Sequence, residues 1–205
     1  MRYNEFRDTF KSYTVISVNE IRKVDGHFNL RRLVEWQAKG YIKKIIRGYY
    51  ILADLKLDEN ALFEIANRIY SPSYISFEMA LSYYHMIPES VYGLTSATSR
   101  KTMVFETNVG DFIYRTIQPR LFFGYKLVNY RDQRFRVAAP EKALLDYFYL
   151  NTSIRSEDDF AGMRIGKDQY FAQVDETHLM AYLNEFQQKS LAKRVKNFMR
   201  YMKNA

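Results

Sequence analysis

Residues 29–52, with the sequence NLRRLVEWQAKGYIKKIIRGYYIL, constrain the fold of this chain more than any other stretch. Asn29 is a favourable residue at the start of a helix and Gly40 is favourable just past the end of one, so a short helix is expected between them. The isoleucine-rich run that follows, turned at Arg47-Gly48, predicts a two-stranded antiparallel hairpin. A helix followed by a basic hairpin is typical of the DNA-contacting half of a winged helix-turn-helix.

The two faces of this expected helix differ in chemistry. At about 100° per residue, one face is mostly apolar and is expected to pack inward: Leu30, Leu33, Val34, Gln37 and Ala38. The other face carries the side chains expected to contact DNA: Arg31, Arg32, Glu35 and Lys39. Arg and Glu can recognise guanine and cytosine edges, whereas Lys suits phosphate. Trp36 lies on the outward face, but tryptophan more often packs, so packing against the preceding helix is favoured over stacking on a nucleotide.

The hairpin adds a second set of cations beside the helix. Lys43, Lys44 and Arg47 are expected to hold the DNA backbone, and the isoleucines are expected to pack inward: Ile42, Ile45, Ile46 and Ile51. Two further helices are predicted before this stretch, over residues 3–13 and from Ser17, which has capping-box spacing to Glu20. A solvated helix beside an unrelated basic hairpin is the alternative, but the whole combination favours DNA binding.

Beyond residue 57 the pattern predicts a mixed domain. Helices are expected over 58–70, 76–86, 140–150, 158–163, 175–188 and 190–203, and strands over 92–98, 102–107, 111–118, 121–128 and 134–138. The predicted fold class is therefore α+β. An N-terminal winged helix-turn-helix over 1–57 is followed over 58–205 by a mixed α/β domain with an antiparallel-rich sheet and terminal helices.

Charge is distributed unevenly along the chain. The net charge is +8, and residues 1–57 hold 12 Lys and Arg against 6 Asp and Glu. Residues 189–205 hold 6 basic residues and no acidic one, whereas the segment between is slightly acidic. Basic charge at the two ends indicates contact with a polyanion.

The last helix combines an apolar stripe with a basic face. Leu191, Val195, Phe198, Met199 and Met202 form the stripe, and the opposite face forms a second basic surface: Lys189, Lys193, Lys196, Arg200 and Lys203. The favoured interpretation is a helix docked by its stripe, with lysines that face solvent. The alternative is a second surface for flanking DNA or an RNA.

The composition excludes several classes of protein. There is no cysteine, so disulfides, zinc thiolates and a cysteine nucleophile are excluded. The N-terminus is too polar for a signal peptide, and no run approaches the ~20 apolar residues of a membrane span. A cytoplasmic protein without membrane contact is expected.

No motif for catalysis stands out. The sequence lacks a Walker loop, a G-x-G-x-x-G motif and a G-x-S-x-G motif, and its three histidines lack metal-ligand spacing. We therefore expect a protein that is not an enzyme and uses no cofactor and no metal. The alternative, a metal-dependent nuclease, would have to gather Glu106, Asp111, Glu141 and Lys142 at one site.

Four stretches resemble the AbiEi-type antitoxins, the transcriptional regulators of abortive-infection type IV toxin–antitoxin systems. They are LVEWQAKGYIKKIIRGYY at 33–50, YISFEMALSYYHMIPESVYGLTSATSRK at 74–101, FIYRTIQPRLFFGY at 112–125 and AAPEKALLDYFYL at 138–150. Within them the family elements fall on Arg47, Gly48 and Tyr50, on Ile87, Pro88 and Glu89, and on the PEKALLD run at 140–146.

The resemblance implies a winged helix that represses its own operon at inverted repeats in its promoter. It also implies a C-terminal domain that neutralises a nucleotidyltransferase-like toxin without a stable complex. One recognition helix covers a short half-site, so a monomer or weak dimer binding double-stranded DNA cooperatively is expected. The alternative is a protein-interaction module that binds a partner through its C-terminal domain.

Overall fold

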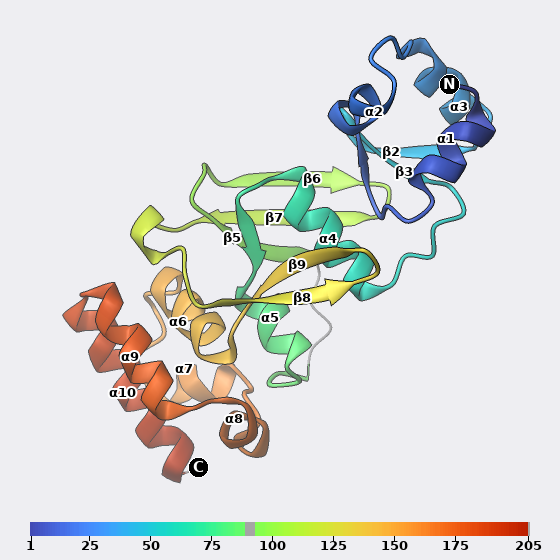
Figure 1. Ribbon diagram of the computed structural model, residues 1–205. Coiled ribbons are helices and arrows are strands. Elements are labelled where there is room, and N and C mark those ends of the chain that lie inside the picture. Colours follow the sequence, from blue (N-terminus) through green and yellow to red (C-terminus); the bar gives the residue numbers. More distant parts are fainter. Residues whose placement is uncertain (89–92, 205) are drawn as a thin grey trace.

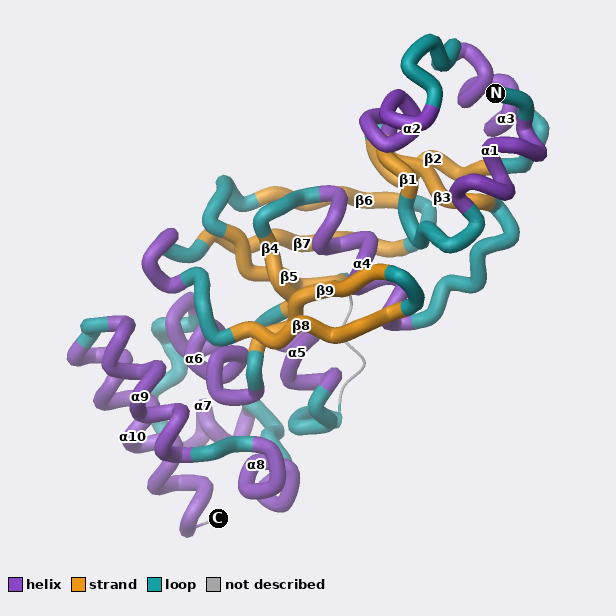
Figure 2. Tube along the Cα trace, in the orientation of Figure 1, coloured by secondary structure: helices purple, strands orange, loops and turns teal. Residues whose placement is uncertain are grey.

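The computed structural model describes residues 1–88 and 93–204 and is mixed α+β. The N-terminal elements lie at one end of the molecule and the C-terminal helices at the other, with a sheet between them (Figures 1 and 2). Glu89 and the start of the strand expected over 92–98 lie outside the described residues.

The first 52 residues form three helices and a small antiparallel sheet. The helices are α1 (Tyr3–Phe10), α2 (Val18–Val24) and α3 (Arg31–Ala38), and the strands are β1 (Ile16–Ser17), β2 (Ile42–Ile46) and β3 (Tyr49–Leu52), in the order β1-β3-β2. The predicted capping box is confirmed, because the Glu20 amide donates to the Ser17 hydroxyl at 3.2 Å and the Ser17 amide donates to the Glu20 carboxylate at 2.8 Å. The hairpin turns at Arg47-Gly48, as predicted.

The two faces of this small sheet pack on different cores. Ile42, Tyr50 and Leu52 face a cluster formed by the N-terminal helices. Ile45 and Ile51 belong to the main core of the molecule. Alternate side chains of a strand point to opposite faces, so the hairpin is buried on both sides. The expected inward packing of the isoleucines is confirmed for Ile42, Ile45 and Ile51, while Ile46 is half-buried.

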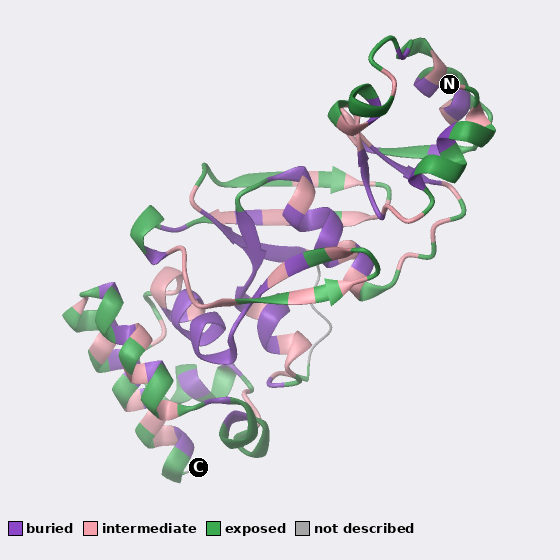
Figure 3. Cartoon of the chain, viewed as in Figure 1, coloured by how far each residue is buried: buried purple, intermediate pink, exposed green. Residues whose placement is uncertain are grey.

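A six-stranded mixed sheet forms the centre of the molecule. Its strands are β4 (Ser73–Ile75), β5 (Leu94–Thr98), β6 (Met103–Thr107), β7 (Gly110–Thr116), β8 (Tyr125–Tyr130) and β9 (Gln133–Ala138), in the order β6-β7-β5-β4-β9-β8. Pairs β6–β7, β4–β5 and β8–β9 are antiparallel, whereas β5–β7 and β4–β9 are parallel. Figure 3 shows β5 buried at the centre and β6 and β8 exposed at the two edges.

Helices cover both faces of this sheet. On one face, the Tyr114 hydroxyl donates to the Ala66 carbonyl of α4 (Glu59–Ile69) at 2.7 Å. On the other, Arg115 pairs with Glu78 of α5 (Phe77–Tyr83) at 3.3 Å. Behind α5 and α6 (Pro140–Leu150) lie the remaining helices: α7 (Glu157–Gly162), α8 (Lys167–Gln173), α9 (Glu176–Phe186) and α10 (Lys189–Asn204).

Several expected boundaries were wrong. β4 and α8 were not predicted, and the strand expected over 121–128 begins only at Tyr125, after the 3-10 turn Pro119–Leu121. The helix expected to reach Met86 ends at Tyr83. A three-residue strand with no polar alternation carries too little pattern to be recognised from sequence, and this accounts for β4.

Candidate nucleic-acid interface

Helix α3 buries a different face from the expected one. Leu33 and Trp36 are buried, whereas Val34 is 66 % exposed and Leu30 is 38 % exposed. Ala38 is exposed as well. The expected inward packing of Leu30, Val34 and Ala38 was therefore wrong. Burying an indole removes far more apolar surface from water than burying an alanine or a valine, so Trp36 determines the rotation of the helix.

Trp36 packs within an aromatic cluster, as expected, but the expected packing against the preceding helix was wrong. Its ring lies 4.9 Å from that of Phe6, 5.5 Å from that of Tyr3 and 5.7 Å from that of Phe28. The partners come from α1 and from the loop before α3, not from the preceding helix α2. Trp36 is thus part of the support for α3 and is not on its outward surface.

The outward face of α3 carries a compact set of exposed side chains. They are Arg31, Val34, Glu35, Ala38 and Lys39. Spacings of three, four, seven and eight residues place them on one side of a helix. The set combines two cations, a carboxylate and two small apolar groups, which are the groups that contact guanine, cytosine and the thymine methyl in a major groove. Sequence reasoning did not place Val34 and Ala38 on the outward face, because apolar residues are normally assigned to the core.

Arg32 does not join this outward face. It is half-buried, and its guanidinium donates to the Met1 carbonyl oxygen at 2.7 Å. The Asn29 carboxamide accepts from the Arg31 amide at 3.0 Å and so supports the first turn of α3. Of the four charged helix residues expected to contact DNA, the structure brings Arg31, Glu35 and Lys39 together and ties Arg32 to the N-terminal segment.

The three hairpin cations are all exposed, but they do not point the same way. Lys44 is paired with Tyr50, whose side chain faces the three helices, and Lys43 is paired with Ile51, which faces the main core. Lys44 therefore lies on the α3 side of the hairpin and Lys43 on the opposite side. Arg47 lies at the turn.

The cations of this interface have no acidic partner in the part of the chain that the structure describes. Within residues 1–88 and 93–204, no ion pair involves Arg31, Lys39, Lys43, Lys44 or Arg47. Their charge is therefore available to an external anion. We call Arg31, Val34, Glu35, Lys39, Lys44 and Arg47 the α3–hairpin surface. Lys43 lies on the opposite side of the hairpin and is not part of it.

The second basic surface lies on α10. Its five residues Lys189, Lys193, Lys196, Arg200 and Lys203 are exposed. The apolar stripe of the same helix is docked, because Leu191, Val195, Phe198 and Met202 are buried and Met199 is half-buried. Lys203 pairs with Glu176 at 2.7 Å. The predicted docking of α10 is thus confirmed, and the possible contact of its basic face with a nucleic acid stays a prediction.

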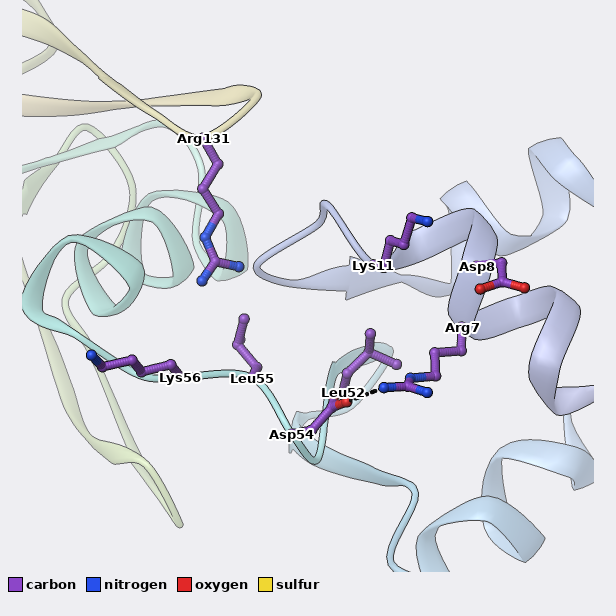
Figure 4. Close-up of a pocket in the computed structure, with 8 residues that line it drawn as sticks. All are labelled: Arg7, Asp8, Lys11, Leu52, Asp54, Leu55, Lys56 and Arg131. Atoms are coloured by element: carbon purple, nitrogen blue, oxygen red, sulfur yellow. Dashed lines mark hydrogen bonds and ion pairs between the residues drawn. The ribbon is translucent and has the colours of Figure 1, made fainter.

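A cleft of about 440 Å³ separates the N-terminal elements from the turn between β8 and β9. Figure 4 shows Arg131 reaching into it from that turn, while Arg7 of α1 reaches Asp54. The Arg7 guanidinium and the Asp54 carboxylate are 2.7 Å apart, and Asp8 also lines the cleft. Lys11 and Lys56 complete its basic lining. Two carboxylates among four cations leave this cleft partly neutralised.

Buried charge in the central domain forms a closed network. Lys142 and Asp146 form an ion pair, and the Tyr74 and Ser76 hydroxyls donate to the other Asp146 oxygen at 2.7 and 2.8 Å. Both charged side chains are fully buried. Burial lowers the pKa of Lys142, and the Asp146 carboxylate opposes that shift. The network satisfies its own polar groups, which is a structural role.

The residues of the nuclease alternative are not gathered at one site. Glu106 and Asp111 face each other at one end of β6 and β7, whereas the Glu141 carboxylate accepts from the Asp175 amide at 2.9 Å and Lys142 is paired with Asp146. No group of three or more His, Asp or Glu side chains in the described part of the chain could hold a metal ion. The cluster on which this alternative depended is absent from the described residues.

None of the known protein families has a model that matches the sequence, and a search of curated proteins finds no match. Among the described helices, none is both long enough and apolar enough to cross a membrane.

Proposed function

We propose that the protein is a DNA-binding transcriptional regulator that represses its own promoter. The observation that carries this proposal is the α3–hairpin surface. On it, exposed cations that form no ion pair with any described residue share a helix face with Val34 and Glu35, beside a hairpin with a cation at its tip. The element order α1-β1-α2-α3-β2-β3 supports this proposal, in which α3 would be the recognition helix and β2–β3 the wing of a winged helix-turn-helix.

In this proposal the roles of the residues differ. Arg31 donates to base edges in the major groove, Glu35 accepts from a cytosine amino group, and Val34 packs on a thymine methyl. Lys39, Lys44 and Arg47 contact backbone phosphates. Arg32 holds the N-terminal segment against α3 and makes no base contact, which revises the role expected from the sequence.

The proposed operator is an inverted repeat bound by two copies of the protein. One helix of eight residues contacts only a few base pairs, so a single copy cannot select one site in a genome. Two copies on adjacent half-sites, about one helical turn apart, would supply the missing specificity.

Fluorescence anisotropy tests the DNA-binding proposal. The probe is the duplex upstream of the protein's own gene, compared with a scrambled duplex from about 50 to 300 mM salt. We expect tighter binding to the promoter duplex at every salt concentration, together with a steep loss of affinity as salt increases. Equal and weak binding to both duplexes would refute the repressor role. Absence of binding to either one at low salt would favour the protein-interaction module instead.

We further propose that the protein acts as the antitoxin of a nucleotidyltransferase-like toxin, without forming a stable complex. Support comes from the resemblance to AbiEi-type antitoxins over residues 33–150. The test is growth of cells that express the toxin encoded next to this gene, with and without this protein. Rescue of growth by a variant with Arg31 and Lys44 changed to alanine would separate the antitoxin role from DNA binding. Failure of the unchanged protein to rescue growth would refute the role.

A further inference from the structure

A hollow of about 660 Å³ lies between the loop after α6 and the first half of α10. It is lined by three cations and four neutral polar residues: Arg155, Lys193, Arg194, Thr152, Gln188, Ser190 and Asn197. The lining contains no carboxylate. Ionised carboxylates only accept hydrogen bonds, whereas cations, hydroxyls and carboxamides can all donate, so the lining is suited to an anion.

Arg194 is the unusual member of this lining. It is 7 % exposed, although it belongs to a helix whose other cations face solvent. Its guanidinium donates to the carbonyl oxygens of Asn151 at 3.0 Å and Ile154 at 3.4 Å, so it closes the loop over the start of α10. Burial lowers the pKa of Arg194, and the positive charge of Arg155 lowers it further.

The Arg155 and Arg194 side chains thus line the same hollow. Among the described residues, neither Arg155 nor Arg194 forms an ion pair. The Asp159 carboxylate is engaged elsewhere, because it accepts from the backbone amides of Arg155 at 2.9 Å and Ser156 at 2.8 Å. A buried cation without an acidic partner is costly, and an external anion would remove that cost.

The cleft in Figure 4 differs from the α10 hollow because carboxylates line it. There the Arg7 guanidinium is already paired with Asp54, and Asp8 also lines the cleft. The α10 hollow is the larger of the two and has no such partner.

We propose that the α10 hollow binds the phosphate group of a phosphorylated ligand. Arg155 and Arg194 would hold the phosphate oxygens, because a guanidinium matches phosphate geometry with two parallel N–H donors. Lys193 would add a third charge, and the Thr152 and Ser190 hydroxyls would donate to the remaining oxygens. The volume leaves room for a group of nucleotide size beyond the phosphate.

A second hollow adjoins the first and could hold the rest of such a ligand. It has a volume of about 260 Å³, shares Arg155 and Asn197 with the first hollow, and continues along α10 to Arg200 and Tyr201. Glu157 is the acidic residue that lines it. The phosphate could come from a free nucleotide or from the 5′ end of a nucleic-acid strand, which present the same chemistry to Arg155 and Arg194.

The proposal is independent of DNA binding by α3. A protein with Arg31 and Lys39 changed to alanine should keep phosphate binding, since those residues lie on the N-terminal elements. Loss of promoter binding in that variant, with phosphate binding unchanged, would show that the two sites act separately.

Isothermal titration of the full chain with inorganic phosphate, AMP and a short 5′-phosphorylated oligonucleotide tests the proposal. We expect saturable binding of at least one probe, weakened about tenfold in Arg155→Ala and in Lys193→Ala. Both positions are exposed, so neither variant should unfold. Arg194→Ala also removes the hydrogen bonds to the loop, so it is a secondary test. The control is Lys11→Ala in the cleft of Figure 4, with an expected change below about twofold.

The probes also identify the source of the phosphate. Tighter binding of AMP than of the oligonucleotide would indicate a free nucleotide, and the reverse would indicate a strand end, provided that a 5′-hydroxyl oligonucleotide binds less well. Both results support a phosphate site. No saturable binding of any probe, or equal weakening in Lys11→Ala and Arg155→Ala, would overturn it.

Discussion

The two basic ends of the chain carry similar charge, but the basic helices α3 and α10 place their apolar residues differently. On α3 the cations share their face with Val34, which is 66 % exposed, and the buried side is held by Trp36. On α10 the cations lie opposite a docked apolar stripe, one of them is paired with Glu176, and Arg194 is buried. Charge alone therefore does not distinguish the exposed face of α3 from the basic face of the docked helix α10. The apolar residues and the acidic partners do.

The acidic middle of the chain differs from both ends in where its charge lies. Part of its excess of carboxylates lies in the interior, because Glu64, Glu141 and Asp146 are buried. Glu141 caps the turn before α9 through the Asp175 amide, and Asp146 neutralises Lys142. These buried carboxylates do not contribute to the surface. The surface of the middle segment is therefore less acidic than its composition suggests.

The largest expected effect separates the apolar residues of the two helices. Phe198→Ala on α10 removes a ring that lies 5.2 Å from Phe148 and 5.6 Å from Phe160, and should lower the free energy of unfolding by about 3–5 kcal/mol. Val34→Ala on α3 should change it by less than about 0.5 kcal/mol, because Val34 is exposed. Urea denaturation of the full chain measures both. A large loss from Val34→Ala would mean that α3 docks on another surface and does not face DNA.

The next effect concerns neighbouring arginines on α3. Arg31→Ala should weaken promoter binding by about 1–3 kcal/mol and reduce the preference over scrambled DNA, because a bidentate base contact is lost. Arg32→Ala is the matched control. It removes the bond to the Met1 carbonyl and should leave sequence preference unchanged. Anisotropy with promoter and scrambled duplexes distinguishes the two, and an equal loss of preference in both variants would contradict the assigned face of α3.

Sequence periodicity predicted the existence of α3 but not its rotation. Gly40, with a positive φ, lies just past the end of the helix as expected, whereas the N-cap is Leu30 and not Asn29. The buried face depended on Phe6 of α1, which is distant in sequence, and on Phe28 of the preceding loop, and both pack on Trp36. A helix of eight residues has too few turns for periodicity to outweigh one such contact.

The second site was less accessible to sequence reasoning. The cations of α10 and its apolar stripe were predicted, yet Arg194 was passed over because it falls between the stripe and the basic face. Its burial depends on the loop at residues 151–154, whose carbonyl oxygens accept its guanidinium hydrogen bonds. No periodic signal marks such a loop, so the α10 hollow could be found only in the structure.

The pH dependence of stability tests the buried carboxyl of Glu64, which lies where the N-terminal elements contact α4. Glu64 of α4 is fully buried, and burial raises the pKa of its carboxyl above the ordinary 4.5, while the neighbouring Thr14 hydroxyl and Arg68 guanidinium partly oppose the shift. The folded state then binds more protons than the unfolded state from about pH 4.5 up to the raised pKa, so stability should fall as pH rises through that range.

Glu64→Gln removes the titrating group and keeps its shape. We expect the urea midpoint of the unchanged protein to fall more between about pH 4 and about pH 8 than that of Glu64→Gln, because only the former must ionise a buried carboxyl. The Glu20–Arg68 ion pair at 2.5 Å joins α2 to α4 beside this site and is present in both proteins. Parallel midpoints at both pH values would show that Glu64 ionises without cost.

The smallest expected effect distinguishes two adjacent lysines of the hairpin. Lys44 lies on the α3 side and Lys43 on the opposite side, since they pair with Tyr50 and Ile51. Lys44→Ala should lower the slope of log affinity against log salt by about 0.9, the value for one lost phosphate contact, whereas Lys43→Ala should leave the slope nearly unchanged. Affinity for scrambled DNA should fall in parallel, because phosphate contacts carry no sequence information. If Lys43→Ala produced the larger change in slope, DNA would have to contact the hairpin from the side of β6, and α3 would no longer be the recognition helix.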